Sequence, residues 1–332
     1  MTSHGGPFRA DGLDLQILHA LQVNGRAGLG MLGRVLKVSD QTVIRRYAKL
    51  RSAGGLRVVG TADEIASGQR RWYVRVRTTP DAATAISQAI ARHPDTAWVR
   101  LVSGGTEIVC SVRAGDAAGG RALLLDILPR ISRVLDVRAQ SELHVHARNA
   151  HRMLQIVGAL DAEQLWMLRE QDPPVPAPDA ATGAGPAGFR VGESDLALLN
   201  VLHDDARAPV EKLAAATGMS PSATRRHLAR LQTSGALRID VDVDPAALGL
   251  HEHALLWINV APAHLETTGA ALATHPQVTF AAVTTGTTNL YVSVMTPDTP
   301  TLYQYLTQQI AALPAIANLE STLVIESLKA SG

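Results

Sequence analysis

The 332-residue sequence has a single cysteine, Cys110, so an intramolecular disulfide framework is excluded and a reducing compartment is indicated. No run approaches the roughly 18 apolar residues that a membrane-spanning helix needs, and residues 1–12 hold no apolar signal core. With 31 basic and 30 acidic residues the net charge is only +1, so any nucleic-acid surface has to be local. We therefore expect a soluble, cytoplasmic protein with no membrane partner.

The sequence also lacks the short motifs of common enzymes. It contains no G-x-S-x-G, no P-loop, no dinucleotide-binding fingerprint and no zinc-ligand spacing. We therefore predict that the chain is not an enzyme, and we assign no catalytic residue, no cofactor and no metal.

Internal repetition is the strongest feature that is present. An offset of 181 residues places Asp14 on Asp195, and further on an offset of 182 places His93 on His275, so one residue is inserted between the domains of the copy. The first-half residues that recur at the shorter offset include Leu15, Leu18, Leu21, Arg26, Leu32, Ser39, Arg45, Leu50, Gly54, Leu56, Arg57 and Gly68. The pattern predicts a duplication of the whole domain arrangement.

The stretches 39–54 and 220–235 are predicted to be helices. Ser39 and Ser220 stand at N-cap positions, and Gly54 and Gly235 stand where a helix ends. The inward faces consist of Val43, Tyr47 and Leu50 in the first helix and Thr224, Leu228 and Leu231 in the second. Two shorter helices precede each stretch, which predicts a helix-turn-helix in each half.

The outward faces of the two helices are short and polar at the start and cationic beyond it. Such a face suits a helix that enters the DNA major groove, because small groups reach base edges while Arg and Lys bind phosphates. The base-contacting residues expected are Gln41, Thr42, Arg45, Ser222, Ala223 and Arg226. The phosphate-contacting residues expected are Arg46, Lys49, Arg57, Arg225, Arg230 and Arg238. A single pattern of this kind would also fit a solvated amphipathic helix. Because the pattern occurs twice, we favour binding to double-stranded DNA. The two helices differ in sequence, so the two half-sites of the operator should differ as well.

After each helix-turn-helix the apolar period changes to a strand, helix, strand, strand, helix, strand order, which predicts a ferredoxin-like sheet. The fold class expected is α+β, with a winged-helix-type helix-turn-helix domain and a ferredoxin-like βαββαβ domain, the pair duplicated in one chain. The domains expected are 1–61 and 193–245 (helix-turn-helix), 62–150 and 246–332 (βαββαβ), and 151–192 (a helix and a Pro/Ala/Gly-rich linker). We expect the two βαββαβ domains to pair, within the chain or with another chain.

This combination resembles the Lrp/AsnC (feast/famine) transcriptional regulators. The resemblance covers both halves except the linker, and its most specific parts are 39–56, 220–237 and the turns 103–107 and 285–289. It implies a DNA-binding transcriptional regulator that forms homo-oligomers through its βαββαβ domains and responds to an amino acid or related small molecule. The residues to which it assigns effector binding are Gly104, Thr106, Glu107, Gly286, Thr288 and Asn289.

The sequence departs from the family pattern at two of these positions. Glu107 and Asn289 stand where the family usually has Asp, so the two pockets should not be equivalent. Related fused proteins also include decarboxylases that act on sirohaem, and an alternative is such an enzyme. The aromatic and histidine cluster expected of it is missing from 98–104 and 280–286. A metabolite-sensing assembly protein that does not bind DNA is a third alternative.

Two other features have plain structural interpretations. Cys110 lies inside an apolar strand, which predicts a buried packing thiol. His144 and His146 share a face of a strand, with His151 nearby, so a metal site is conceivable. The copy has nothing matching there, which favours solvated or locally hydrogen-bonded histidines.

Overall fold

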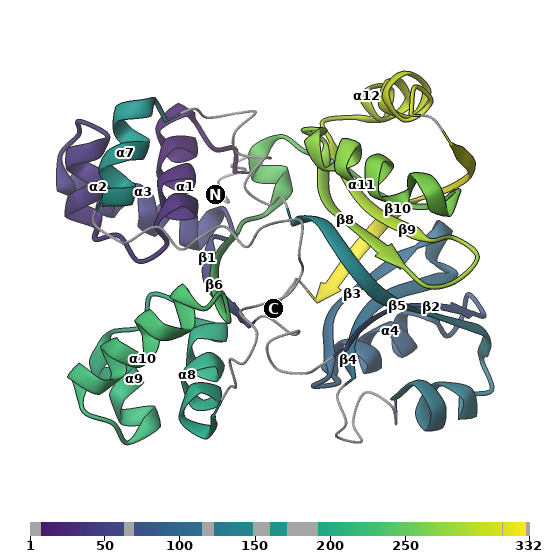
Figure 1. The fold of residues 1–332 in the computed structure, drawn as a ribbon, viewed down its shortest axis with the longest axis horizontal. Coiled ribbons are helices and arrows are strands. Elements are labelled where there is room, and N and C mark those ends of the chain that lie inside the picture. The colour runs from purple at the N-terminus through teal and green to yellow at the C-terminus, as the bar shows by residue number, and fades with distance from the viewer. Residues whose placement is uncertain are drawn as a thin grey trace, which may run out of the picture. The chain divides into compact units, whose positions relative to one another are not determined.

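The computed structural model describes residues 8–62, 70–114, 123–148, 160–170, 192–313 and 315–329. The chain forms two compact units (Figure 1), the first made of Met1–Asp63 and Ala150–His251 and the second of Glu64–Asn149 and Glu252–Gly332. Each unit therefore takes one segment from each half of the repeat, and the expected pairing of βαββαβ domains occurs within one chain. The expected linker lies almost wholly outside the described residues.

The first unit contains the two helix-turn-helix segments. Its elements are α1 (Gly12–Val23), α2 (Leu29–Val35), α3 (Asp40–Ala53), β1 (Arg57–Ala62), α7 (Ala162–Glu170), α8 (Glu193–Asp204), α9 (Val210–Thr217), α10 (Pro221–Thr233) and β6 (Leu237–Asp242). Asp11 caps α1 by accepting hydrogen bonds from the backbone N–H groups of Leu13 and Asp14. Both helices with the cationic faces form where the sequence places them, within two residues at each end.

The two halves of this unit are joined by a pair of strands and by mutual hydrogen bonds from two arginines. Strands β1 and β6 pair antiparallel, with Arg57 opposite Asp242 and Ala62 opposite Leu237. Arg26 donates hydrogen bonds to the carbonyl oxygens of Ala206 and Ala208, the latter at 3.0 Å. Arg207, the repeat counterpart of Arg26, donates to Gly25 O at 2.6 Å and to Ala27 O at 2.8 Å. We call Arg26 and Arg207 the reciprocal arginines, because each binds the backbone of the other half.

Helix α7 packs on the first helix-turn-helix. Leu168 is fully buried in the same core as α1 and α2. Gln164 Nε2 donates a 3.1 Å hydrogen bond to Val35 O, the last residue of α2, and the Leu160 N–H donates to His19 Nδ1 at 3.3 Å. The expected helix is thus present, but it is part of a folded core and not of a linker.

The glycines of α2 are explained by a close approach of Asp40, the first residue of α3. A Cβ added at Gly30 would lie 2.9 Å from an Asp40 carboxylate oxygen. A Cβ at Gly33 would lie 2.6 Å from the other oxygen and 3.0 Å from the backbone oxygen of Val38. The glycines therefore let the turn between α2 and α3 close tightly.

This difference predicts opposite effects for two alanine substitutions. Gly33→Ala should destabilise the first unit by about 1 kcal/mol, because the backbone oxygen of Val38 cannot move aside and overpacking outweighs helix propensity. Gly30→Ala should be neutral or stabilising by up to about 1 kcal/mol, because only the mobile Asp40 side chain is in the way. Urea denaturation of both variants measures this, and equal effects would contradict the role given to Val38.

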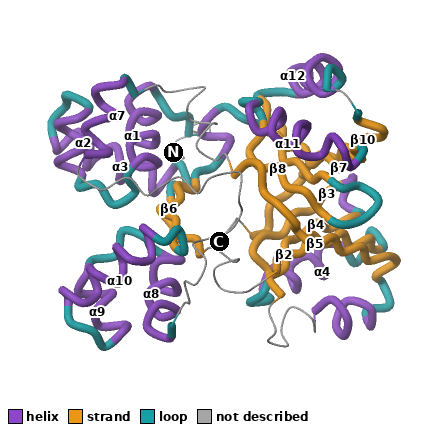
Figure 2. The backbone as a smooth tube through the Cα atoms, in the orientation of Figure 1, coloured by secondary structure: helices purple, strands orange, loops and turns teal. Residues whose placement is uncertain are grey.

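The second unit is a closed barrel of eight antiparallel strands, drawn in orange in Figure 2. The strands are β2 (Arg70–Thr78), β3 (Thr96–Val102), β4 (Glu107–Ala114), β5 (Val134–Arg148), β7 (Glu252–Val260), β8 (Val278–Thr284), β9 (Leu290–Thr296) and β10 (Ile316–Lys329). Their order is β10-β3-β4-β2-β5-β8-β9-β7. Each half supplies a four-stranded ferredoxin-like sheet, and the pairs β5–β8 and β10–β3 join the two sheets.

Helices accompany both sheets, with two departures from expectation. The helices α4 (Ala83–Arg92) and α11 (Leu265–Thr274) form as predicted. The helix expected over 121–134 is replaced, in its described part, by a π turn (Leu123–Ile127) and a 3₁₀ turn (Leu128–Arg130). Pro129 in the second turn lacks the N–H that an α-helix would use. The helix expected over 299–312 is α12 (Thr299–Gln304) followed by a π-helical segment to Ile310.

The single thiol is confirmed as a packing group. Cys110 is fully buried in the core under β4, and burial raises the pKa of its thiol to about 12. It therefore stays protonated and unreactive near neutral pH. Among the described residues, every helix is too short or too polar to span a bilayer.

Candidate nucleic-acid interface and ligand pocket

The outward face of α3 is open to solvent. Val43 and Leu50 are fully buried, and Ser39 Oγ caps the helix by accepting a 3.2 Å hydrogen bond from the Thr42 N–H. On the opposite side Gln41, Arg45 and Lys49 are exposed, as is Arg57 at the start of β1, while Thr42 is half-buried beside the cap. The division into inner and outer faces is the one that the sequence predicts.

Helix α10 repeats this division. Ser220 Oγ accepts a 3.3 Å hydrogen bond from the Ala223 N–H, and Leu228 and Leu231 are buried. Ser222, Arg225, Arg226 and Arg230 are exposed, and Ala223 and Arg238 are half-buried. The exposed cations thus line the outward side of both helices.

Two of the cations expected to contact phosphates instead form ion pairs with the first helix of their own half. Arg46 pairs with Asp11 and with Asp14, at 3.3 Å from the latter. Arg230 donates to both carboxylate oxygens of Asp195 at 2.5 and 2.6 Å. These contacts tie α3 to α1 and α10 to α8, so we now regard Arg46 and Arg230 as positioning residues.

The aspartate of the second pair is buried and charged. Burial raises the pKa of Asp195, but hydrogen bonds from Arg230, from the Gly192 N–H and from His227 outweigh it and hold that pKa below its usual value. Asp14 and Asp195 occupy the same repeat position and are 1% and 2% exposed. The recurrence of an aspartate at the same position of the first helix in both copies was the sequence signal for these pairs.

In the second unit, the turn between β3 and β4 carries the first set of predicted effector residues. Ser103, Gly104 and Gly105 all have positive φ, at 54°, 67° and 85°, a conformation that favours glycine at the two later positions. Thr106 is exposed and donates a 2.9 Å hydrogen bond to Ser103 O. Glu107 follows and is only 5% exposed.

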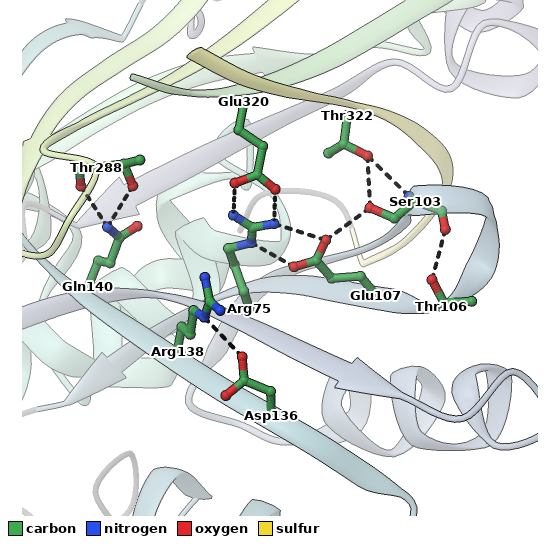
Figure 3. A network of polar contacts seen from close by, with 10 residues as sticks. All are labelled: Arg75, Ser103, Thr106, Glu107, Asp136, Arg138, Gln140, Thr288, Glu320 and Thr322. Carbon is green, nitrogen blue, oxygen red and sulfur yellow. Dashed lines mark hydrogen bonds and ion pairs between the residues drawn. The ribbon is translucent and has the colours of Figure 1, made fainter. Parts of the chain in front are cut away.

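Glu107 is held by Arg75 (Figure 3). Arg75 Nε and Nη2 donate to its two carboxylate oxygens at 2.6 and 3.1 Å, and Ser103 Oγ donates to one of them at 2.9 Å. The same guanidinium donates to both oxygens of Glu320, at 2.5 and 2.8 Å, and lies 4.0 Å from the centre of the Trp257 ring. We call Arg75, Glu107 and Glu320 the Arg75 cluster. Its two acids come from different halves of the chain.

The Arg75 cluster forms one wall of a cavity of about 270 Å³. The residues that line the cavity are Arg75, Arg77, Ser103, Thr106, Glu107, Asp136, Arg138 and Glu320. Arg138 Nε donates a 2.9 Å hydrogen bond to Asp136. The pocket thus offers cationic and anionic groups side by side.

In the equivalent turn of the second half, 285–289, the polar groups form hydrogen bonds with other parts of the protein. Gln140 Nε2 donates to the backbone oxygen of Thr288 at 2.7 Å and to its hydroxyl at 3.0 Å (Figure 3). Asn289 bonds with both the N–H and the oxygen of Val260, at 2.9 and 2.7 Å. Gly286 has a φ of 108°, and a Cβ there would lie 2.7 Å from Gln140 Nε2. The polar groups expected to meet an effector in this half are therefore engaged within the protein.

Sequence reasoning missed a group of aromatic side chains that the two halves bring together. The rings of Tyr73 and Tyr291 stack with centroids 4.7 Å apart, and Trp98 lies 6.3 Å from Tyr291. The Arg100 guanidinium is 4.4 Å from the Trp98 ring. Burial and the neighbouring Arg100 lower the pKa of His253 well below its usual value, so that this histidine is neutral. The stretches 98–104 and 280–286 alone do not reveal this group, because most of its members come from strands far apart in sequence.

Comparison with known proteins gives separate matches for the helix-turn-helix segments and for a βαββαβ segment. Residues 11–51 and 193–232 match the model of the AsnC-type helix-turn-helix domain, and residues 253–332 match that of the Lrp/AsnC ligand binding domain. The HTH-type transcriptional regulator AldR of Mycolicibacterium smegmatis is 31% identical over 139 residues, which cover 41% of this chain and 81% of that protein. The chain belongs to the Lrp/AsnC family.

Within the Lrp/AsnC family this protein is a tandem member, since the helix-turn-helix match occurs twice. A second relative, HTH-type transcriptional regulator FL11 of Pyrococcus horikoshii, is 24% identical over 138 residues, which cover 41% of this chain and 91% of that protein. The predicted family, fold class and duplication are confirmed.

One expectation is overturned. The crystal structure of the siroheme decarboxylase NirDL matches with a TM-score of 0.62 and 12% identity, over 97% of this chain and 93% of that chain. A fold that spans almost the whole chain is therefore also the fold of an enzyme. The prediction that this Lrp/AsnC protein is not an enzyme was wrong, since the absence of known motifs does not exclude catalysis on this fold.

Proposed function

We propose that the protein is a sequence-specific regulator of transcription that binds double-stranded DNA through α3 and α10. The observation that supports this best is the pair of capped helices whose exposed faces carry Gln41, Arg45, Ser222 and Arg226. The reciprocal arginines and the β1–β6 pairing join both helices in one unit. Because the two faces differ in sequence, the two half-sites differ as well.

We further propose that the cavity beside the Arg75 cluster binds an amino acid or a related zwitterion. Arg77 and Arg138 would meet its carboxylate, and Asp136 or the 48% exposed side chain of Glu320 would meet its ammonium group. Gly104 and Thr106 shape the rim, while Glu107 acts indirectly by holding Arg75. The turn with Gly286, Thr288 and Asn289 would bind no effector, so the chain would take one ligand.

A gel-shift titration tests both proposals. DNA flanking the gene for this protein should be shifted specifically, and one amino acid from a pool should change the apparent affinity at least threefold. Arg138→Gln should abolish the response to that amino acid without loss of DNA binding, while Arg133→Gln, which removes an exposed cation outside the cavity, should keep it. A response unchanged in Arg138→Gln would place the effector elsewhere.

Higher assembly is proposed through the second unit. Leu143 on β5 and Ile325 on β10 are 62% and 57% exposed although both are large and apolar, and such residues are often covered by a partner. A further copy of this chain is the partner that the family resemblance implies.

Chemistry on a carboxylated tetrapyrrole is a second candidate function. It is favoured by the shared fold with the siroheme decarboxylase NirDL, together with the group of Tyr73, Arg100, His253 and Tyr291. Incubation with sirohaem, followed by absorbance in the Soret region and by mass, distinguishes the two functions. Loss of carbon dioxide from sirohaem would establish the enzyme, and an unchanged sirohaem with specific DNA binding would establish the regulator.

A further inference from the structure

Two imidazoles and a carboxylate meet where α11 packs on β5. The rings of His144 and His146 lie with their centroids 4.6 Å apart and their planes at 77°. Glu266, in the first turn of α11, places a carboxylate oxygen 4.0 Å from His146 Nε2. One ligand atom of each of the three residues lies within 4.8 Å of the others.

The sequence suggested solvated or locally hydrogen-bonded histidines, but one nitrogen of each ring has no such partner. Nε2 of His144 and Nε2 of His146 are both buried and form no hydrogen bond with any described residue. Buried polar atoms without a partner are rare in folded proteins, and each requires a physical explanation. The expectation of solvated or locally hydrogen-bonded histidines therefore fails for these two atoms.

A glycine in α11 brings Glu266 close to the two histidines. Gly269 lies one turn beyond Glu266, on the same side of α11, and a Cβ there would lie 2.2 Å from the His146 ring. The glycine thus lets the helix approach the ring and brings Glu266 over the histidines.

We propose that His144, His146 and Glu266 bind a divalent transition-metal ion of the zinc type. Two imidazole nitrogens and one carboxylate form a ligand set that zinc accepts, with its fourth position left for water or a small ligand. Mg²⁺ and Ca²⁺ are disfavoured, because they prefer all-oxygen ligands. The donor atoms need to draw together, and the Glu266 side chain, 76% exposed, is free to make that movement.

The repeat predicts a stoichiometry of one ion per chain. At an offset of 182 residues, His144, His146 and Glu266 correspond to Glu326, Leu328 and Thr84. Because Leu328 cannot be a ligand, the second half has no equivalent site.

The test is a titration of the full-length, chelator-treated protein with Zn²⁺ by isothermal calorimetry and with Co²⁺ by visible absorbance. We expect one site per chain with a Kd of about 1 µM or tighter, and cobalt bands typical of four-coordination. Glu266→Gln should weaken Zn²⁺ binding at least tenfold and His144→Gln at least a hundredfold. His251→Ala, which removes an exposed histidine outside the cluster, should leave binding unchanged.

The variants also separate loss of ligands from loss of folding. Glu266 is largely exposed, so Glu266→Gln should keep the circular dichroism spectrum and melting temperature of the metal-free protein. Zinc should raise the melting temperature of the natural chain and of His251→Ala but not that of His144→Gln. Unchanged stoichiometric binding in both Glu266→Gln and His144→Gln, or no binding by the folded natural chain, would overturn the proposal.

Discussion

Replacement of Arg45 and Arg226 by alanine together should lower affinity for a specific operator at least a hundredfold and leave the fold intact. Both side chains are exposed on the outward faces of α3 and α10. A bidentate contact from arginine to a guanine contributes about 1–3 kcal/mol of discrimination, so two such losses amount to roughly 2–6 kcal/mol. Since 1.4 kcal/mol corresponds to a tenfold change, the middle of this range exceeds a hundredfold.

Fluorescence anisotropy with labelled operator and with unrelated DNA measures the effect, and circular dichroism checks the fold. With Arg46 and Arg230 held by aspartates, four of the six expected phosphate-contacting residues remain, and the log–log salt slope should be roughly −4. The double variant should keep this slope within about one unit if the two arginines contact bases. Arg92→Ala with Arg130→Ala removes two exposed cations from the second unit and serves as the matched control. If the DNA affinity of the natural chain does not depend on salt concentration, the DNA proposal is contradicted.

Replacement of Arg75 by methionine should destabilise the second unit by about 3–5 kcal/mol, because it leaves a buried charge without its partner. Glu107 is 5% exposed and receives two hydrogen bonds from Arg75. The variant also loses the contact between the guanidinium and the Trp257 ring. Urea denaturation followed by tryptophan fluorescence measures the change in the free energy of unfolding.

Two comparisons test whether the unpaired charge is the cause. Glu320→Gln should cost at most about 1 kcal/mol, because that partner is half exposed and water can replace it. Arg75→Met combined with Glu107→Met should recover much of the lost stability, because no charge is then buried alone. If Arg75→Met and Glu320→Gln have equal effects, the burial of Glu107 is not decisive.

The same cluster fixes the sign of a pH effect. Hydrogen bonds from Arg75, opposed by partial burial, lower the pKa of Glu320 below its usual value. The stability that this carboxylate contributes is therefore complete above the pKa of an unfolded glutamate, about 4.3, and is lost as the pH falls through the lower folded value. In Arg75→Met this part of the acid sensitivity should disappear.

Local features were predictable from the sequence and distant contacts were not. The ends of α3 and α10 follow from Ser39 and Ser220, because caps and apolar spacing act within a few residues. The cluster of Arg75 with Glu320 joins residues 245 positions apart, and no periodicity records such a contact. The closure of the second turn by Gln140 was hidden for the same reason, since that side chain comes from the other half of the chain.

The sequence also did not show which charged residues face solvent and which form ion pairs. Arg45 and Arg46 are neighbours of the same type, yet the first faces solvent and the second faces Asp14. The glycines of α2 accommodate Asp40, a contact that their spacing alone does not reveal. In both cases the deciding partner is a side chain on another helix.

The pairing of β1 with β6 and the reciprocal arginines have a genetic consequence. In a regulator built from two separate chains, a defective allele can combine with the normal product and inactivate it. Here the partner of each helix-turn-helix is encoded in the same reading frame, so mixed pairs do not form through this contact and dilution does not separate them. A mutation in one half is therefore always inherited together with the other half that it contacts. Each half can also change without the same change in its copy.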